Sequence, residues 1–585
     1  MKPNNNQQSG KAINKKDVQK KGTFPQNPGT VMVKYPLLWL ALAAFIVYIP
    51  TLSFTFTELD DIIFIKEFGP YNEQWSNLTV SFQRGLFDAV KDPYFRPMFL
   101  DSMIFNYHLP GEGLEKYHLV NILLHISSVL LLYGVFIRLN VRKLPAFVLS
   151  LVFAIHPVLS QAVAWIPGRN DTLLAVFTLS FFITAIDHFH FGRIKDLALA
   201  TLMLLLAFFT KETAVFVPLV LVVMLALVMR QKLTSKNNMI LLVACAVCFV
   251  TWYVVRAQSP NIKASEPQAG TMINDFVHRL PLIVQYIGKI LLPVNQSVFP
   301  LQQDTSYIYG IAAIVIIAVG LALSKQANWR VVAGGAIIFI LFLVPALLVP
   351  NNLNEQTFEH RLYLPMIGML LLLSETVLFK KMADSSLLIA GAGICVVMAG
   401  ANFIYQRNFK AAVPFWTQAV ETSPHSAYAK MMLAAREDNV SDSYRLFRDA
   451  YKLDPNQKYI NYYYGRMLQM QDSVLQSEPY LLREKKISDF YECDFYLARV
   501  AMTKGDTMGT IGYLESYTQR NPTSEPAHSN LVLTYMSKRM YAAARKHMAK
   551  MRQLGVPVNP KFDEMINAAL IIPPSPPPAA TSKTK

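Results

Sequence analysis

Cysteine and charged residues are both scarce in this chain, and each shortage argues against a class of protein. The 585 residues include four cysteines, and three of them, Cys245, Cys248 and Cys395, lie inside apolar runs. This placement argues against the disulfide framework of a small secreted protein. Charged residues make up 16% of the chain and hydrophobic residues 53%. The balance indicates a polytopic membrane protein and not a soluble domain.

Signals for nucleotide and nucleic-acid binding are also missing. The sequence has no glycine-rich phosphate loop, which argues against a sugar nucleotide handled in the cytoplasm as the substrate. The net charge of +16 lies mostly in short loops between apolar runs and in a lysine-rich N-terminus. It therefore follows membrane topology, and we predict no nucleic-acid partner.

Eleven apolar runs are each long enough to cross about 30 Å of hydrocarbon. They lie near residues 35–55, 117–137, 144–163, 171–187, 196–210, 213–229, 239–256, 308–324, 331–350, 362–379 and 386–405. Basic residues follow every even-numbered run, as expected of cytoplasmic loops. We predict an all-α polytopic membrane domain over residues 35–407 with about 11 transmembrane helices. The odd count places the first outer loop, 56–116, a surface helix at 274–292 and the C-terminal region on the outer side.

The two ends of the chain differ from this membrane domain in composition. Residues 1–34 form a basic segment with little to bury and are predicted to be disordered. From residue 408 the sequence turns polar, and prolines recur at roughly the tetratricopeptide length of 34 residues. This pattern predicts a small TPR-like α-helical domain over 408–565. A disordered Pro-rich tail, 566–585, follows.

Asp60 and Asp61 stand where the first apolar run ends. Carboxylates are costly beside hydrocarbon, so the pair is a functional-site candidate, although a solvated interfacial cap is the plain alternative. Four outer turns bring basic groups to the same membrane edge, namely Arg96, Arg169, Lys211 and Arg361. The recurrence favours the functional interpretation.

Further polar groups point to a cleft at this edge. His118, Asn121 and His125 are spaced to share one face of a helix, and the alternative is a polar seam satisfied by neighbouring helices. The remaining candidates for the cleft are Asn106, His156, Asp171 and Glu212.

One chemistry suits this set: a lipid phosphate held at the membrane edge while its sugar passes to an acceptor hydroxyl. Arginine and lysine would clamp the phosphate and stabilise it as a leaving group. A carboxylate would accept the proton of the acceptor. An acidic pair is also a possible ligand set for a divalent metal, so metal dependence stays open.

At these motifs the chain resembles the transmembrane and tetratricopeptide-repeat O-mannosyltransferases and, more distantly, the protein O-mannosyltransferases of the GT-C fold. The matching stretches are 59–61, 95–97, 106–107, 117–125, 153–157, 168–171, 211–212 and 360–365, in the order of the family. The resemblance implies a polyprenyl- or dolichyl-phosphate-mannose donor, an outer or lumenal active site and an inverting transfer. One aspartate of the pair Asp60 and Asp61 would be the catalytic base, and Asp60 is the preferred candidate. The repeats are few and degenerate, so acceptor choice does not carry over.

Several alternatives and expected partners accompany this hypothesis. Short loops and the Lys/Asn-rich leader are typical of bacteria and predict a periplasmic site on the inner (cytoplasmic) membrane; a eukaryotic chain would place the site and the C-terminus in the ER lumen.

The expected partners are a lipid-linked sugar donor, membrane lipids, and a protein or glycan acceptor bound through the TPR-like domain. The rivals are a non-catalytic scaffold that recruits envelope proteins, transfer to a lipid or polysaccharide, and a transporter, which charges gathered at one face disfavour.

Overall fold

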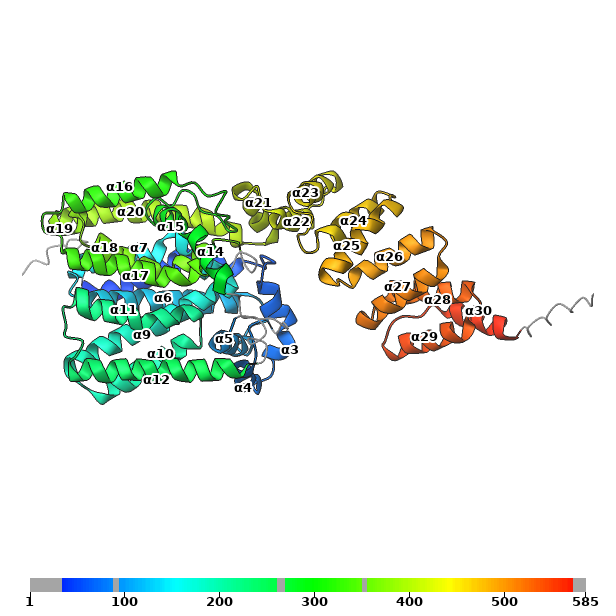
Figure 1. The fold of residues 1–585 in the computed structure, drawn as a ribbon, viewed down its shortest axis with the longest axis horizontal. Helices are drawn as coiled ribbons and strands as arrows, with labels where there is room; N and C mark the ends of the chain where they lie inside the picture. Colours follow the sequence, from blue (N-terminus) through cyan, green and yellow to red (C-terminus); the bar gives the residue numbers. More distant parts are fainter. Residues whose placement is uncertain (1–33, 88–93, 260–268, 350–354, 572–585) are drawn as a thin grey trace, which may run out of the picture.

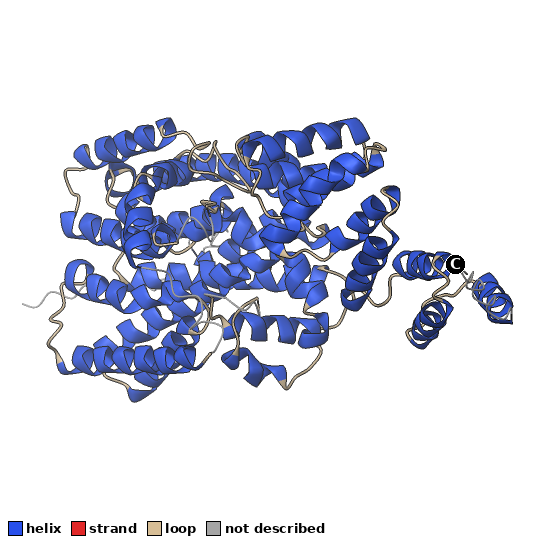
Figure 2. Cartoon of the chain, turned by 45° about the vertical axis from the view of Figure 1, so that its right-hand side comes forward, coloured by secondary structure: helices blue, strands red, loops and turns tan. Residues whose placement is uncertain are grey.

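The computed structural model of the chain describes residues 34–87, 94–259, 269–349 and 355–571. Throughout these ranges the secondary structure is helical and no strand occurs, which confirms the all-α prediction (Figure 2). The helices form a bundle of long, nearly parallel members, from which a row of shorter helices extends (Figure 1). Nearly all of the predicted basic N-terminus and most of the Pro-rich tail lie outside the described residues.

Among the described residues, six helices are long and apolar enough to cross a membrane, which makes this a multi-pass membrane protein. They are Pro36–Ser53 (α2 and its 3-10 extension), Glu115–Arg138 (α6), Ile166–Phe191 (α9 with one preceding turn), Lys236–Gln258 (α12), Trp329–Leu347 (α17) and Asp384–Phe409 (α20 with a final 3-10 turn). In the last of these helices, only 17% of the most apolar 18-residue segment is buried within the protein. Most of its surface is therefore suited to contact with lipid.

The other five predicted runs are also helical but shorter or bent. Lys143–Ile155 (α7) and Pro157–Ala164 pass the same criterion together, with a 50° bend between them. The remaining four runs coincide with Ile194–Phe208 (α10), Glu212–Val228, Ile308–Ala322 (α16), and Pro365–Leu373 with Val377–Lys381 (α18 and α19). The count of eleven crossings therefore stays a prediction.

The basic turns gather at one end of the bundle, as their alternation along the sequence predicts. A series of contacts connects them: Arg142 with Phe379 O, Arg138 with Asp187, Asn237 with Phe189 O, Arg230 with Asn328, and the Asn328 backbone N–H with Glu375. Each contact joins two helix ends, or the turns next to them, that are far apart in the sequence. The charge pattern thus sorts the turns of the bundle correctly between its two ends.

The opposite end carries the loop 56–116 and the start of the C-terminal region (Figure 1). The loop contains the short helices Gly69–Asn72 (α3) and Asn77–Val80 (α4) and the longer Pro97–Tyr107 (α5). The predicted surface helix at 274–292 is divided between Ala269–Arg279 (α14) and Leu282–Leu291 (α15). At Gly288 a Cβ would lie 2.6 Å from the backbone nitrogen of Gly310, so α15 approaches α16 as closely as only glycine permits.

In the described part of the chain, ten α-helices follow the last long apolar helix. They are α21 (Ala412–Thr422), α22 (Ala427–Ala434), α23 (Val440–Leu453), α24 (Ile460–Met470), α25 (Glu478–Ser488), α26 (Glu492–Thr503), α27 (Thr507–Arg520), α28 (Glu525–Ser537), α29 (Tyr541–Gln553) and α30 (Pro560–Ile571). Successive helices pack on one another and bury apolar faces between them. The assignment of this row as TPR-like stays a prediction.

The predicted domain boundary after residue 407 lies inside one hydrophobic cluster. Phe415 and Trp416 of α21 pack with Phe54, Trp165 and Phe299 of the membrane domain, and all five are buried. Such a cluster holds α21 against the membrane domain, because separating the two would expose apolar surface at a free-energy cost of about 25 cal/mol per Å². The first C-terminal helix therefore belongs, by packing, to the membrane domain.

Candidate functional site

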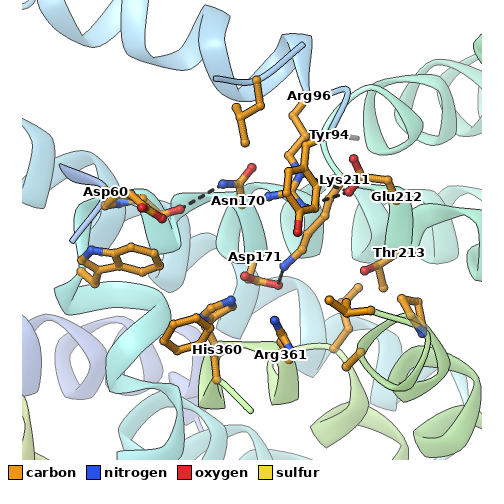
Figure 3. Close-up of a pocket in the computed structure, with 18 of the residues that line it drawn as sticks. Asp60, Tyr94, Arg96, Asn170, Asp171, Lys211, Glu212, Thr213, His360 and Arg361 are labelled. Carbon is orange, nitrogen blue, oxygen red and sulfur yellow. Dashed lines mark hydrogen bonds and ion pairs between the residues drawn. The ribbon is translucent and has the colours of Figure 1, made fainter. Parts of the chain in front are cut away.

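A cavity of about 390 Å³ opens at the end of the bundle opposite the basic turns. Its polar wall comes from five separate segments: the residue after Leu59, the stretch just before α5, the start of α9, the turn at 211–213, and the turn at 359–362 (Figure 3). The polar side chains are Asp60, Tyr94, Arg96, Asn170, Asp171, Lys211, Glu212, Thr213, His360 and Arg361. Phe342, Pro345, Ala346, Val349, Leu364 and Pro365 form an apolar wall from α17 and α18. The cavity therefore joins a charged surface to an apolar one.

Asp60 and Asp61 have different surroundings. Asp61 is 1% exposed, and its Oδ2 accepts hydrogen bonds from the backbone N–H and the hydroxyl of Thr57, at 2.6 and 2.9 Å. Its Oδ1 accepts from the Ile62 N–H at 3.1 Å. Asp60 instead lines the cavity. Asp61 thus stabilises the turn, and Asp60 is the carboxylate that a ligand can reach.

The surroundings of Asp60 favour its protonated form. Burial is the largest cause and the negative charge of Asp61 adds to it, while the nearby Arg96 acts in the opposite direction; together they raise the pKa of Asp60 to about 7. A carboxyl group with such a pKa can accept and release a proton near neutral pH.

Two of the three cavity cations form ion pairs. Arg96 lies 3.0 Å from Glu212, and Lys211 lies 2.6 Å from Asp171. Arg361 donates to the backbone carbonyl of Gln356 at 2.9 Å, and within the described residues it has no carboxylate partner. A guanidinium in this state is available to an anionic ligand.

Besides Nε1 of Trp165, three buried polar atoms in the cavity wall have no hydrogen-bond partner in the part of the chain that the structure describes. They are Oδ1 of Asn170, Oδ2 of Asp171 and Nδ1 of His360. Burial, with the cations Lys211, Arg361 and Arg96, holds the pKa of His360 well below its usual range, so the imidazole is neutral. Buried polar groups are normally hydrogen-bonded, and these three together suit a ligand rich in hydroxyl groups.

Arg169, predicted as a phosphate ligand, does not line the cavity. It is fully buried and donates to Asn121 Oδ1 at 2.8 Å, Asn106 Oδ1 at 2.5 Å, and the backbone oxygens of Ser102 and Tyr117 at 3.2 and 2.9 Å. These bonds connect α5, α6 and α9. Arg169, Asn106 and Asn121 thus hold the scaffold behind the cavity.

The predicted histidines of the cleft also lie in the packed interior. His125 pairs with the Tyr363 hydroxyl at 2.7 Å and with Ala154 O at 2.9 Å. His156 pairs with Ile290 O at 2.7 Å, and His118 is buried beside Phe54. None of the three lines the cavity. The shared helical face is therefore a polar seam between helices.

The sequence prediction missed several lining residues. Asn170 and His360 are not among the predicted site residues, although each is adjacent to one in the sequence. Tyr94 and Thr213 belong to no sequence pattern that would have indicated a site. No group of three or more His, Cys, Asp or Glu side chains that could hold a metal occurs in the described ranges. The cavity acids Asp171 and Glu212 instead face the cations Lys211 and Arg96.

Comparison with known proteins bears on this site. A protein O-mannosyl-transferase of Caenorhabditis elegans is 23% identical over 388 residues, which cover 62% of this chain and 54% of that protein. Protein O-mannosyl-transferase TMTC1 of Mus musculus is 31% identical over 138 residues, 23% of this chain and 15% of the relative. TMTC2 of Mus musculus is 32% identical over 122 residues, 20% of this chain and 13% of the relative.

These comparisons confirm the resemblance seen in the sequence motifs. The chain is similar to protein O-mannosyl-transferases. It spans about half the length, or less, of the curated relatives named here. No protein-family model matches the chain.

Proposed function

We propose that this protein transfers a sugar, mannose by analogy with its relatives, from a polyprenyl-phosphate donor to a hydroxyl group of a protein Ser or Thr. The observation that carries the proposal is that one cavity, at one end of the helix bundle, contains both the carboxyl of Asp60 and the guanidinium of Arg361. Arg96 and Lys211 have carboxylate partners, whereas Arg361 has none among the described residues. The names of the relatives support the reaction class and the protein acceptor.

The two walls of the cavity match the two parts of such a donor. The apolar wall from α17 and α18, with Phe342 and Pro345, suits the first isoprene units. Arg361 suits the phosphate, because a guanidinium can donate two parallel hydrogen bonds to it. Lys211 and Arg96 add positive charge at the same surface, and their own carboxylate partners keep them fixed.

The reaction assigns one role to each group. The carboxylate of Asp60 accepts the proton of the acceptor hydroxyl, while the hydroxyl oxygen forms a bond to the anomeric carbon. The bond from that carbon to the phosphate oxygen breaks, and its electron pair leaves with the polyprenyl phosphate. Arg361 stabilises the added negative charge on the phosphate. Attack from the face opposite the leaving group inverts the anomeric centre.

The three unpartnered polar atoms supply the sugar site. Asp171 Oδ2 and Asn170 Oδ1 would accept hydrogen bonds from sugar hydroxyls, and the neutral His360 would make a third. The Trp165 ring, which also lines the cavity and lies 5.7 Å from the His360 ring, offers an apolar face for the sugar.

A reconstituted assay tests the proposal. The purified full chain is supplied with radiolabelled polyprenyl-phosphate mannose and a Ser/Thr-rich peptide, and transfer and the anomeric configuration of the product are measured. Asp60→Asn should lower kcat by about 10² to 10⁴ with the donor KM nearly unchanged, because it removes a general base at constant volume. Asp101→Asn is the matched control, because this carboxyl is also buried but does not line the cavity, and it should retain most of the activity.

Two outcomes would count against this assignment. Transfer by Asp60→Asn at the parental rate would remove Asp60 from the reaction. Donor and peptide that bind without any transfer would favour the scaffold alternative, and transfer to a glycan in place of the peptide would change the acceptor class.

A further inference from the structure

The segment that carries Asp60 is held by the first helix pair of the C-terminal region. The indole N–H of Trp416, on α21, donates to the backbone oxygen of Thr57 at 3.1 Å, and Trp416 is fully buried. Arg436, which follows α22, forms an ion pair with Glu58. Farther back, the Thr55 N–H donates to Lys410 O at 2.8 Å.

These contacts act on a turn whose backbone is strained and whose polar groups are already hydrogen-bonded. Glu58 has φ = 57°, the left-handed region that non-glycine residues seldom adopt. A residue keeps such a conformation only when its surroundings enforce it, at a cost of about 1–3 kcal/mol. Thr57 donates both its N–H and its hydroxyl to Asp61, while its carbonyl is bound by Trp416. Every polar group of Thr57 is therefore engaged, and one of its three hydrogen bonds comes from the C-terminal region, from α21.

Helix α21 also supports the part of the cavity wall that carries His360 and Arg361. Gln418 accepts from the Val298 N–H at 2.9 Å and donates to Gln296 O at 3.1 Å. The Trp416 ring lies 5.5 Å from Phe299, and Phe299 lies 5.6 Å from Phe358. Phe358 in turn stacks on the His360 ring with centroids 5.3 Å apart. Helix α21 thus contacts the Asp60 turn directly and the turn of His360 and Arg361 through two phenylalanines.

We propose that α21 and α22 are a positioning part of the catalytic unit, in which Trp416 and Arg436 set the place of Asp60 relative to the bound sugar. The role rests on the proposed function for its kinetic consequence, and it goes beyond a separate acceptor-recruiting domain that begins at residue 408. Neither residue lines the cavity, so each acts through the Thr57–Glu58 backbone and not on the substrate.

Full-length variants test this role kinetically. Trp416→Phe keeps the aromatic packing but removes the N–H donor, and Arg436→Gln removes the charge that faces Glu58. Both should lower kcat by roughly tenfold to a hundredfold, because a displacement of about 1 Å at a reacting group has effects of this size. The donor KM should stay within about twofold, since the phosphate ligands are untouched. Arg436→Lys should recover most of the rate.

The control lies in the same row of helices. Arg520→Gln breaks an ion pair with Asp489 in which both side chains are at least half exposed, far along the row at α27. It should leave kcat and KM at parental values. If Arg436→Gln and Arg520→Gln behave alike, or if the loss in Arg436→Gln appears in KM alone, the positioning role is refuted.

Hydrogen exchange provides a readout that needs no transferase activity. The amides of Thr57 and Ile62 donate to Asp61, and their exchange in peptides that cover 55–64 should accelerate in Trp416→Phe and Arg436→Gln but not in Arg520→Gln. Peptides of α6 and α9 should keep parental rates, which separates local release from global unfolding. Unchanged exchange at 55–64 in both variants would overturn the inference even if the proposed reaction is correct. Faster exchange without any sugar transfer by the parent would refute the proposed function alone.

Discussion

The rate of transfer should depend on pH through Asp60, and the profile can be worked out from its surroundings. Burial and the adjacent charge of Asp61 raise the pKa of Asp60 to about 7, and only the ionised carboxylate can accept a proton. With a pKa of about 7, roughly nine-tenths of Asp60 is protonated at about pH 6 and roughly nine-tenths is ionised at about pH 8. The value of kcat/KM should therefore rise about tenfold across this interval.

Two variants separate Asp60 from other titrating groups. Asp61→Asn removes the negative charge that contributes to the raised pKa of Asp60, so the midpoint should move to lower pH. The midpoint should stay above the value of about 3.9 for a solvated aspartate, because burial is the larger cause. Asp101, whose pKa burial raises to about 6, bonds to Ser81 and does not line the cavity. Asp101→Asn is therefore the matched control and should leave the profile unchanged.

The measurement is initial-rate transfer in detergent or proteoliposomes from about pH 5.5 to 8.5 at constant ionic strength. A flat profile across this range would mean that Asp60 is already ionised, which contradicts the reasoning from burial. A sloping profile that persists in Asp60→Asn would assign the titration to another group. His360 is an unsuitable candidate, because its pKa is held well below the usual value.

Other predictions concern the phosphate ligand, the buried ion pair and the topology. Arg361→Gln should raise the donor KM by about tenfold to a hundredfold, the equivalent of a lost charged hydrogen bond of about 1.5–3 kcal/mol; an unchanged KM would remove Arg361 from the phosphate site. Lys289→Met leaves Glu359, which is 0% exposed, without its cation and should lower the free energy of unfolding by about 3–5 kcal/mol; a loss below about 1 kcal/mol in denaturant unfolding would contradict this. Because the four native cysteines are buried, Lys504→Cys and Lys381→Cys should react with an impermeant thiol reagent from opposite sides of the membrane. Reaction from the same side would refute the predicted topology.

The sequence by itself determined the helices and their order. In a membrane every backbone N–H and C=O must be bonded within the protein, so a long apolar run has little choice but to be helical. All eleven predicted runs are helical in the structure. The alternation of basic turns also predicted correctly which turns meet at one end of the bundle, as the contact between Arg142 and Phe379 illustrates.

The residues of the candidate site could be predicted only in part from the sequence. Asp60, Arg96, Lys211 and Arg361 come from distant segments and share one cavity, as their common position at membrane edges suggested. Arg169 has the same position in the sequence but points into the scaffold. Local spacing tells which side chains share a face of a helix, but not which neighbour that face will contact.

Only the tertiary structure decided which part of the membrane domain the first C-terminal helix packs against. The change from apolar to polar composition after residue 407 marks where the chain leaves the hydrocarbon, and nothing in that change indicates what the next helix packs against. The bond between Trp416 and Thr57 joins residues 359 positions apart. The composition of a segment indicates whether lipid or water surrounds it. The hydrogen-bond partner of a buried indole depends instead on a matching shape and on a backbone carbonyl placed within reach, and only folding brings these together.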